Sequence, residues 1–130
     1  MNAEIIKNSI GPFDSEEKIR FWFDFFNKEV FYGSLKYFDD VIIGEDLSYE
    51  LWGSLYYYEA NEIEDGSPEQ FHLAIQPFLN FRDFLGTLVH EMVHLFQGQI
   101  QKNFAFPEPE NDITFRLFDD RVSPYGITAI

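Results

Sequence analysis

Two histidines and a glutamate in the stretch LVHEMVHLFQ, residues 88–97, have the types and spacing of a zinc site. His90 and His94 are four residues apart, so on a helix both rings project from one face, one turn apart, and can bind one ion. Glu91 lies about 100° further round the helix than His90, near the ion but not bound to it. From there its carboxylate can take a proton from zinc-bound water, whose pKa the metal lowers toward about 7.

A histidine pair at this spacing also arises by chance, and most such pairs are surface or core histidines. In this chain, however, two of only three histidines lie in the motif, and apolar residues surround them at positions 88, 89, 92, 93 and 95. We therefore interpret His90 and His94 as metal ligands and Glu91 as the catalytic general base. The remaining histidine, His72, falls on the polar face of an alternating segment and is interpreted as structural.

The helices that must position this motif can be predicted from capping residues and hydrophobic spacing. Asn80 can cap a helix that continues to about residue 102, with an apolar stripe at positions 85, 88, 92 and 95. An earlier helix, which Asp14 or Ser15 can cap, is expected to run to about Gly33. The segment ITFRLFDD after residue 112 is either a short third helix or irregular, and the last ten residues need docking to be ordered.

Three segments between these helices have the composition of β-strands: FDDVIIG, LSYELWGSLYYYEA and QFHLAIQP. The last of them alternates cleanly, and the stretch EDGSPEQ before it is typical of a turn. We expect a single α+β domain over residues 1–130, in which an N-terminal helix, a three-stranded, mostly antiparallel sheet and the motif-bearing helix pack together.

The composition of the chain limits the classes of function that it can have. Of its 130 residues 45% are hydrophobic and 19% aromatic, enough for a sizeable core, and the lack of cysteine excludes disulfides, thiol catalysis and a cysteine-based zinc ribbon. The net charge of −14 disfavours direct binding to nucleic acid or to anionic membranes. Because neither a membrane span nor a signal peptide is evident, we expect a cytoplasmic protein.

Three stretches, in this order, resemble the SprT-like zinc metallopeptidase domain: FNKEVFYGSL, WGSLYYY and FHLAIQPFLNFRDFLGTLVHEMVHLFQ. The matching residues are Asn27, Phe31, Gly33, Leu35, Gly53 and Thr87 to His94, and the resemblance covers about residues 16–100. The HEMVHLFQ form is most similar to the short bacteriophage versions, and this chain lacks the zinc ribbon of the cellular ones. The resemblance implies a zincin-like fold, Zn²⁺ bound by His90 and His94, Glu91 as general base, and a protein or peptide substrate.

The third metal ligand is where the sequence departs from the family pattern. Members of the family carry a further histidine after the motif, whereas no histidine follows His94 here. The best local match, NDITF, puts Asn111 in that position, and an amide oxygen is a poor zinc ligand. Carboxylates at Glu108, Glu110 and Asp112 flank it, and sites with two histidines and a glutamate are known. We favour Glu110 as the third ligand and keep the other three residues as alternatives.

Other functions stay open beside hydrolysis. Without a third ligand the chain would be a degenerate peptidase fold that acts as an acidic binding protein, for example an inhibitor of a basic host protein. A weaker alternative is a nucleic-acid mimic whose acidic face competes with DNA for a partner. For the peptidase, FHLAIQ is a candidate edge for pairing with substrate backbone, and one of Tyr56, Tyr57 and Tyr58 can donate to an oxyanion.

Overall fold

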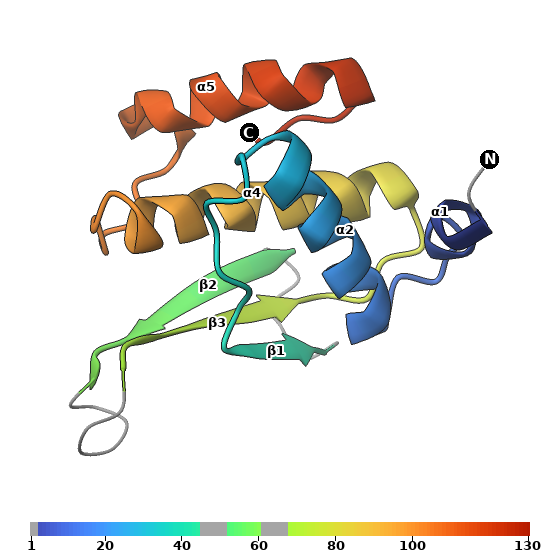
Figure 1. Cartoon of the computed structure of the whole chain (residues 1–130), viewed down its shortest axis with the longest axis horizontal. Coiled ribbons are helices and arrows are strands. Elements are labelled where there is room, and N and C mark those ends of the chain that lie inside the picture. Colours follow the sequence, from blue (N-terminus) through green and yellow to red (C-terminus); the bar gives the residue numbers. More distant parts are fainter. Residues whose placement is uncertain (1–2, 45–51, 61–67) are drawn as a thin grey trace.

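The computed structural model describes residues 3–44, 52–60 and 68–130 (Figure 1). In chain order the described elements are α1 (Ala3–Asn8), α2 (Glu16–Glu29), β1 (Asp40–Ile43), β2 (Gly53–Tyr58), β3 (Gln70–Ile75), α4 (Phe81–Gln99), the short 3-10 helix η1 (Pro109–Asn111), α5 (Ile113–Val122) and a second 3-10 helix, η2 (Ser123–Tyr125). This part of the chain is an α+β structure with four α-helices and a three-stranded sheet. Among the described helices, none combines the length and the apolar character that a bilayer crossing requires.

The sheet is mixed, with strand order β1-β3-β2. β2 runs antiparallel to β3, whereas β1 runs parallel to it, so the predicted mostly antiparallel sheet is corrected to one pair of each kind. Because β3 is the central strand and is paired on both sides, the prediction that FHLAIQ forms an edge for substrate was wrong. The alternation in this segment reports which face is buried, and it carries no information on the position of the strand in the sheet.

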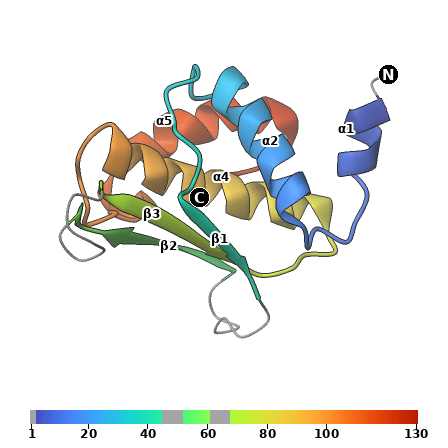
Figure 2. The ribbon, with the colours of Figure 1, turned by 60° about the horizontal axis from the view of Figure 1, so that its bottom comes forward.

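Helix α4 is the middle layer of the molecule. Figure 1 shows the sheet on one side of α4 and α5 on the other, with α2 crossing α4, and the turned view in Figure 2 shows α2 and α5 together on the side of α4 away from the sheet. A helix enclosed in this way must be apolar on more than one face. This accounts for the complete burial of both Val93 and Leu95, whose side chains leave α4 about 160° apart.

Aromatic side chains join the layers. The rings of Phe31, which follows α2, and Phe118 on α5 stack with centroids 4.3 Å apart, and Phe13 stacks on Phe84 of α4 at 4.8 Å. All four rings are buried. The high phenylalanine content therefore forms the core that holds α4, and with it the histidine motif, in place.

The two predicted helices are confirmed, with shifted ends. The Ser15 side chain accepts a hydrogen bond from the Lys18 amide, so Ser15 is the cap of α2, and Asn80 caps α4 by accepting from the Asp83 amide. Helix α2 ends at Glu29, before Gly33, whose φ of 73° belongs to the turn that follows. Helix α4 ends at Gln99, short of the predicted residue 102.

The C-terminal part of the chain is ordered in the structure. ITFRLFDD forms most of α5, which the Asp112 side chain caps by accepting from the Thr114 amide. After η2, Ile127 and Ala129 are buried, so the last residues dock on the domain. Helix α1 was not predicted, and most of the predicted turn at residues 64–70 lies outside the described residues.

Candidate metal centre

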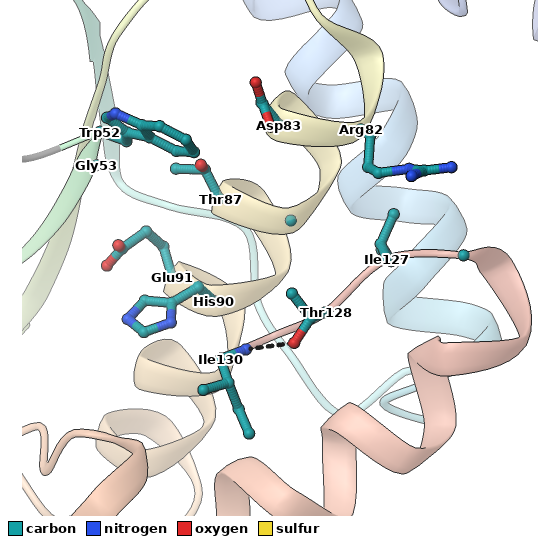
Figure 3. Close-up of a pocket in the computed structure, with 12 residues that line it drawn as sticks. Trp52, Gly53, Arg82, Asp83, Thr87, His90, Glu91, Ile127, Thr128 and Ile130 are labelled. Atoms are coloured by element: carbon teal, nitrogen blue, oxygen red, sulfur yellow. Dashed lines mark hydrogen bonds between the residues drawn. The ribbon is translucent and has the colours of Figure 1, made fainter.

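Helix α4 presents the three motif residues from its buried middle section. Glu91 and His94 are each only 4% exposed, while the side chain of His90 is 24% exposed. Figure 3 shows His90 and Glu91 leaving α4 side by side. A buried carboxylate next to two imidazoles is costly for a helix with no other role, because burial disfavours its charged form.

The loop after α4 brings Glu108 to the two histidines. One carboxylate oxygen of Glu108 lies 3.4 Å from Nε2 of His90, and the other lies 3.5 Å from Nε2 of His94. Ligand atoms of these three residues lie within 4.8 Å of one another, so the group could hold a metal ion.

The other candidates for a third ligand lie outside this group. Glu110 and Asn111 are exposed in η1, and Asp112 caps α5. The structure thus brings His90 and His94 together with Glu108, one of the alternatives, and not with the favoured Glu110. The reason is the path of the loop, which turns Glu108 toward α4 before η1 begins.

The ring of His90 is oriented by a backbone carbonyl. Its Nδ1 lies 2.7 Å from the carbonyl oxygen of Ala129. Because a carbonyl can only accept, Nδ1 must carry the proton, and in the neutral ring Nε2 then has a free lone pair. That lone pair is on the side of Glu108.

The ring of His94 is oriented in the same sense by a glutamine. Its Nδ1 lies 2.8 Å from Oε1 of Gln97, and the amide nitrogen of Gln97 donates to the Pro107 carbonyl at 3.0 Å and to Asp112 Oδ2 at 2.7 Å. These two acceptors determine which way the amide points, so its oxygen must face His94 and accept from Nδ1. Gln97 is fully buried, and we infer that Nε2 of His94 is also left free.

When both imidazoles are neutral, the atoms that converge on the centre of the group all carry lone pairs. Two Nε2 atoms and the Glu108 carboxylate face one another, an arrangement that a cation between them relieves. Two ligand atoms that each lie about 2.0–2.1 Å from a zinc ion, at the tetrahedral angle to one another, are about 3.3–3.4 Å apart. The nitrogen–oxygen distances of 3.4 and 3.5 Å are close to that value, and two imidazoles with a carboxylate are a donor set that zinc accepts.

The surroundings of the group favour a neutral His94 and keep both imidazole rings in place. Burial lowers the pKa of His94, and the neighbouring His90 lowers it further, which favours the form that can bind a metal. The Phe115 ring of α5 packs against both imidazoles, with centroids 4.8 Å from His90 and 5.1 Å from His94. His72 lies elsewhere, with its Nε2 2.9 Å from Gln70 Oε1, and takes no part in the group.

Glu91 is held between α4 and the start of β2. A Cβ atom on Gly53 would lie 3.4 Å from Cγ and from Oε2 of Glu91 and only 2.9 Å from Cγ2 of Thr87. Residue 53 is therefore a glycine because the β2 backbone passes too close to Thr87 for a Cβ atom, and it does so beside Glu91. Burial raises the pKa of Glu91 to about 8, and the nearby Glu108 carboxylate contributes to the rise.

A pocket of about 650 Å³ adjoins the group. It is lined by Trp52, Gly53, Arg82, Asp83, Gly86, Thr87, His90, Glu91, Gly126, Ile127, Thr128 and Ile130. Figure 3 shows α4 as its floor, with Trp52 on one side and the C-terminal segment on the other. Trp52 and Ile130 are 52% and 59% exposed, so large apolar surfaces face the open space beside His90 and Glu91. The tyrosines of β2 do not line this pocket, and the oxyanion role suggested for one of them stays a prediction.

Several residues of the centre were not identified from the sequence. Gln97 follows His94 by three positions and so shares its helix face, a signal that could have suggested a contact. No sequence signal points to the Ala129 carbonyl, because its role depends only on where the C-terminal segment docks. Comparison of the chain with protein-family models, with curated proteins and with solved structures finds no match.

Proposed function

We propose that this chain is a zinc-dependent metallopeptidase of the SprT-like kind, with a zincin-like fold. The observation that carries the proposal is the convergence of two oriented Nε2 atoms and the Glu108 carboxylate beside the buried Glu91. His90, His94 and Glu108 would hold the ion. When bound, zinc supplies Lewis acidity, which polarises a carbonyl and makes a neighbouring water molecule more acidic.

Glu91 is the residue of the chain that moves the proton. Its carboxylate accepts a proton from the attacking water as the water oxygen bonds to the peptide carbonyl carbon. It then delivers that proton to the nitrogen of the leaving amine when the carbon–nitrogen bond breaks. The β2 backbone at Gly53 lies close to the Glu91 side chain and limits the space in which its carboxylate can move between the two transfers.

The pocket supplies a place for the substrate. It begins at His90 and Glu91 and extends between Trp52 and the C-terminal segment, so a peptide bound at the centre can place a neighbouring side chain in it. The exposed apolar surfaces of Trp52 and Ile130 favour an apolar side chain there. Of the two outer strands among those described, β2 is the one that lies beside Glu91, so it replaces β3 as the candidate partner for substrate backbone.

The test is cleavage of an unstructured protein such as casein by the zinc-loaded chain, compared with two variants. Glu91→Gln should keep its zinc and lose at least about 100-fold in rate, because it removes the proton acceptor and leaves the ligands. Glu110→Gln, which removes an exposed carboxylate outside the group, should cleave at the wild-type rate. Wild-type activity in the Glu91 variant would refute the mechanism.

A second candidate is an acidic binding protein on the same fold. The net charge of −14 favours it, because such a surface attracts basic partners. The two candidates differ in what a His90→Ala, His94→Ala double variant would do. A binding protein would keep its affinity for a basic partner in that variant, whereas a peptidase would lose turnover. A zinc-loaded chain that cleaves no member of an unbiased peptide library would favour the binding role.

A further inference from the structure

The C-terminal segment, residues 126–130, runs back along α4 beside the metal centre. Gly126, with a φ of 76°, turns the chain after η2, and Figure 3 shows the residues that follow passing over α4 near His90. The contact is close, since a Cβ atom on Gly86 would lie 3.2 Å from the Thr128 carbonyl oxygen. Ala129 is fully buried in this segment although Thr128 and Ile130 on either side are exposed.

The two backbone groups of Ala129 bind to two different parts of the molecule. Its carbonyl oxygen accepts from His90 Nδ1 at 2.7 Å, and its amide donates to Asp119 Oδ1 on α5 at 2.9 Å. The same Asp119 oxygen accepts from the Thr128 hydroxyl at 2.7 Å. The Asp119 carboxylate and the His90 imidazole are thus joined through a single residue of main chain.

The two histidines differ in how their orienting partners are held. His94 is oriented by Gln97, which lies on the same helix one turn further on and is fully buried. His90 is oriented by a carbonyl on a separate segment, whose place relative to α4 must be held by other contacts. Asp119 supplies two of these contacts, on the residue that carries the carbonyl and on the one before it.

We propose that Asp119 is a positioning residue of the metal centre, which acts on His90 through the backbone of Ala129. The proposal rests on His90 being a metal ligand, as in the proposed function, but not on peptidase activity. Outer partners of metal-bound histidines commonly change metal affinity by 10–100-fold when removed. Because Asp119 acts through an intermediate, we expect an effect near the lower end, about tenfold.

Three variants of the full chain separate this role from a general effect on folding. Asp119→Ala removes the acceptor, whereas Asp119→Asn keeps a side-chain oxygen that can accept both hydrogen bonds. Asp120→Ala is the matched control, with the same change of charge at the next position of α5, where the side chain is exposed. The backbone carbonyl of Asp120, which accepts from the Ser123 hydroxyl, is retained in that control.

Two measurements on these variants test the proposal. Competition with a chromophoric chelator gives the zinc dissociation constant, and proton–nitrogen correlation spectra of the imidazoles in zinc-free protein report which nitrogen of His90 is protonated. In Asp119→Ala the dissociation constant should rise about tenfold, and the His90 signals should move toward a mixture of tautomers. Asp119→Asn and Asp120→Ala should resemble the wild type in both measurements.

Contrary results are equally defined. An unchanged dissociation constant and unchanged His90 signals in folded Asp119→Ala would overturn the proposal. An equal loss of zinc affinity in Asp119→Asn or Asp120→Ala would also overturn it, because it would indicate an effect of charge. If Asp119→Ala does not fold, Thr128→Val decides by the same criteria, since at an exposed site it removes the hydroxyl that donates to Asp119 and accepts from the Ile130 amide. If the wild type binds no zinc, the proposed function fails, and the His90 signals alone decide the role of Asp119.

Discussion

The two oxygens of Glu108 are divided between the two histidines, with Oε1 3.5 Å from Nε2 of His94 and Oε2 3.4 Å from Nε2 of His90. This contact closes a group that α4 alone leaves open on one side. In the proposed metal centre this carboxylate, from the loop that leads to α5, would take the place of the third histidine of the family that the sequence resembles.

Glu108 should contribute to zinc binding, and Glu110 should not. Glu108→Gln replaces the carboxylate, whose two oxygens face one Nε2 atom each, by a neutral amide, which is a weaker donor, so the zinc dissociation constant should rise by at least about tenfold. Glu110→Gln makes the same chemical change at an exposed position of η1 and should leave the constant within about twofold. Chelator competition measures both, and a larger effect at Glu110 would restore it as the third ligand.

Gln97 should support both the fold and the metal centre. Gln97→Leu removes a hydrogen-bond partner from the buried His94 and from the partly buried Pro107 and Asp112, so the free energy of unfolding should fall by about 1–3 kcal/mol and zinc should bind at least about tenfold more weakly. Urea unfolding and chelator competition measure the two effects. Gln101→Leu, which loses one hydrogen bond to Thr114 at an exposed site, is the control and should change zinc binding little.

Glu91 should make the stability of the zinc-free protein depend on pH. Its pKa in the folded state, about 8, is above the ordinary value of 4.5, because burial and then Glu108 disfavour the charged form. Between these values the folded state keeps a proton that the unfolded state has released, so the free energy of unfolding falls as pH rises from about 4.5 to about 8.

The variant Glu91→Gln cannot ionise and should escape that loss. The free energy of unfolding of Glu91→Gln minus that of the wild type should therefore be larger at pH 8 than at pH 5. The increase should exceed about 1 kcal/mol, since one pKa unit corresponds to about 1.4 kcal/mol. Urea unfolding with chelator present, at both pH values, measures the difference. A difference that is the same at pH 5 and pH 8 would show that Glu91 does not titrate in this range.

Gly53 should be intolerant of a side chain because of Thr87. Gly53→Ala places a Cβ atom 2.9 Å from Thr87 Cγ2, closer than such atoms pack, and the free energy of unfolding should fall by about 1–3 kcal/mol. Thr87→Ser removes that methyl group and should recover part of the loss in the double variant, a coupling that a double-mutant cycle measures. Additive effects of the two changes would mean that the contact does not exist.

The helices and the motif were predictable because their signals are local. Ser15 and Asn80 cap α2 and α4 as their side chains predict, and the spacing of His90 and His94 determines that they share one helix face. The mixed sheet was not predictable in the same way, since a strand pattern indicates a buried face and not a neighbour. Helix α1, with only six residues and one buried side chain, has too short a pattern to be identified.

The remainder of the centre depends on contacts between distant segments. Glu108 faces the histidines because the loop after α4 is held by Gln97, which binds the Pro107 carbonyl immediately before Glu108. Nothing in the spacing of Glu108, Glu110 and Asp112 distinguishes the residue that this contact turns inward. The Ala129 carbonyl is likewise a backbone group, which any residue at that position would supply.

The proposed metal centre is tested most directly by the zinc content of gently purified protein, measured by elemental analysis beside the variants His94→Ala and Glu110→Gln. We predict about one zinc per chain in the wild type and in Glu110→Gln, and a large loss in His94→Ala, which removes a ligand while Gln97 remains. A wild type that holds no zinc even after exposure to the metal, or a His94→Ala variant that keeps a full equivalent, would contradict the proposed metal centre.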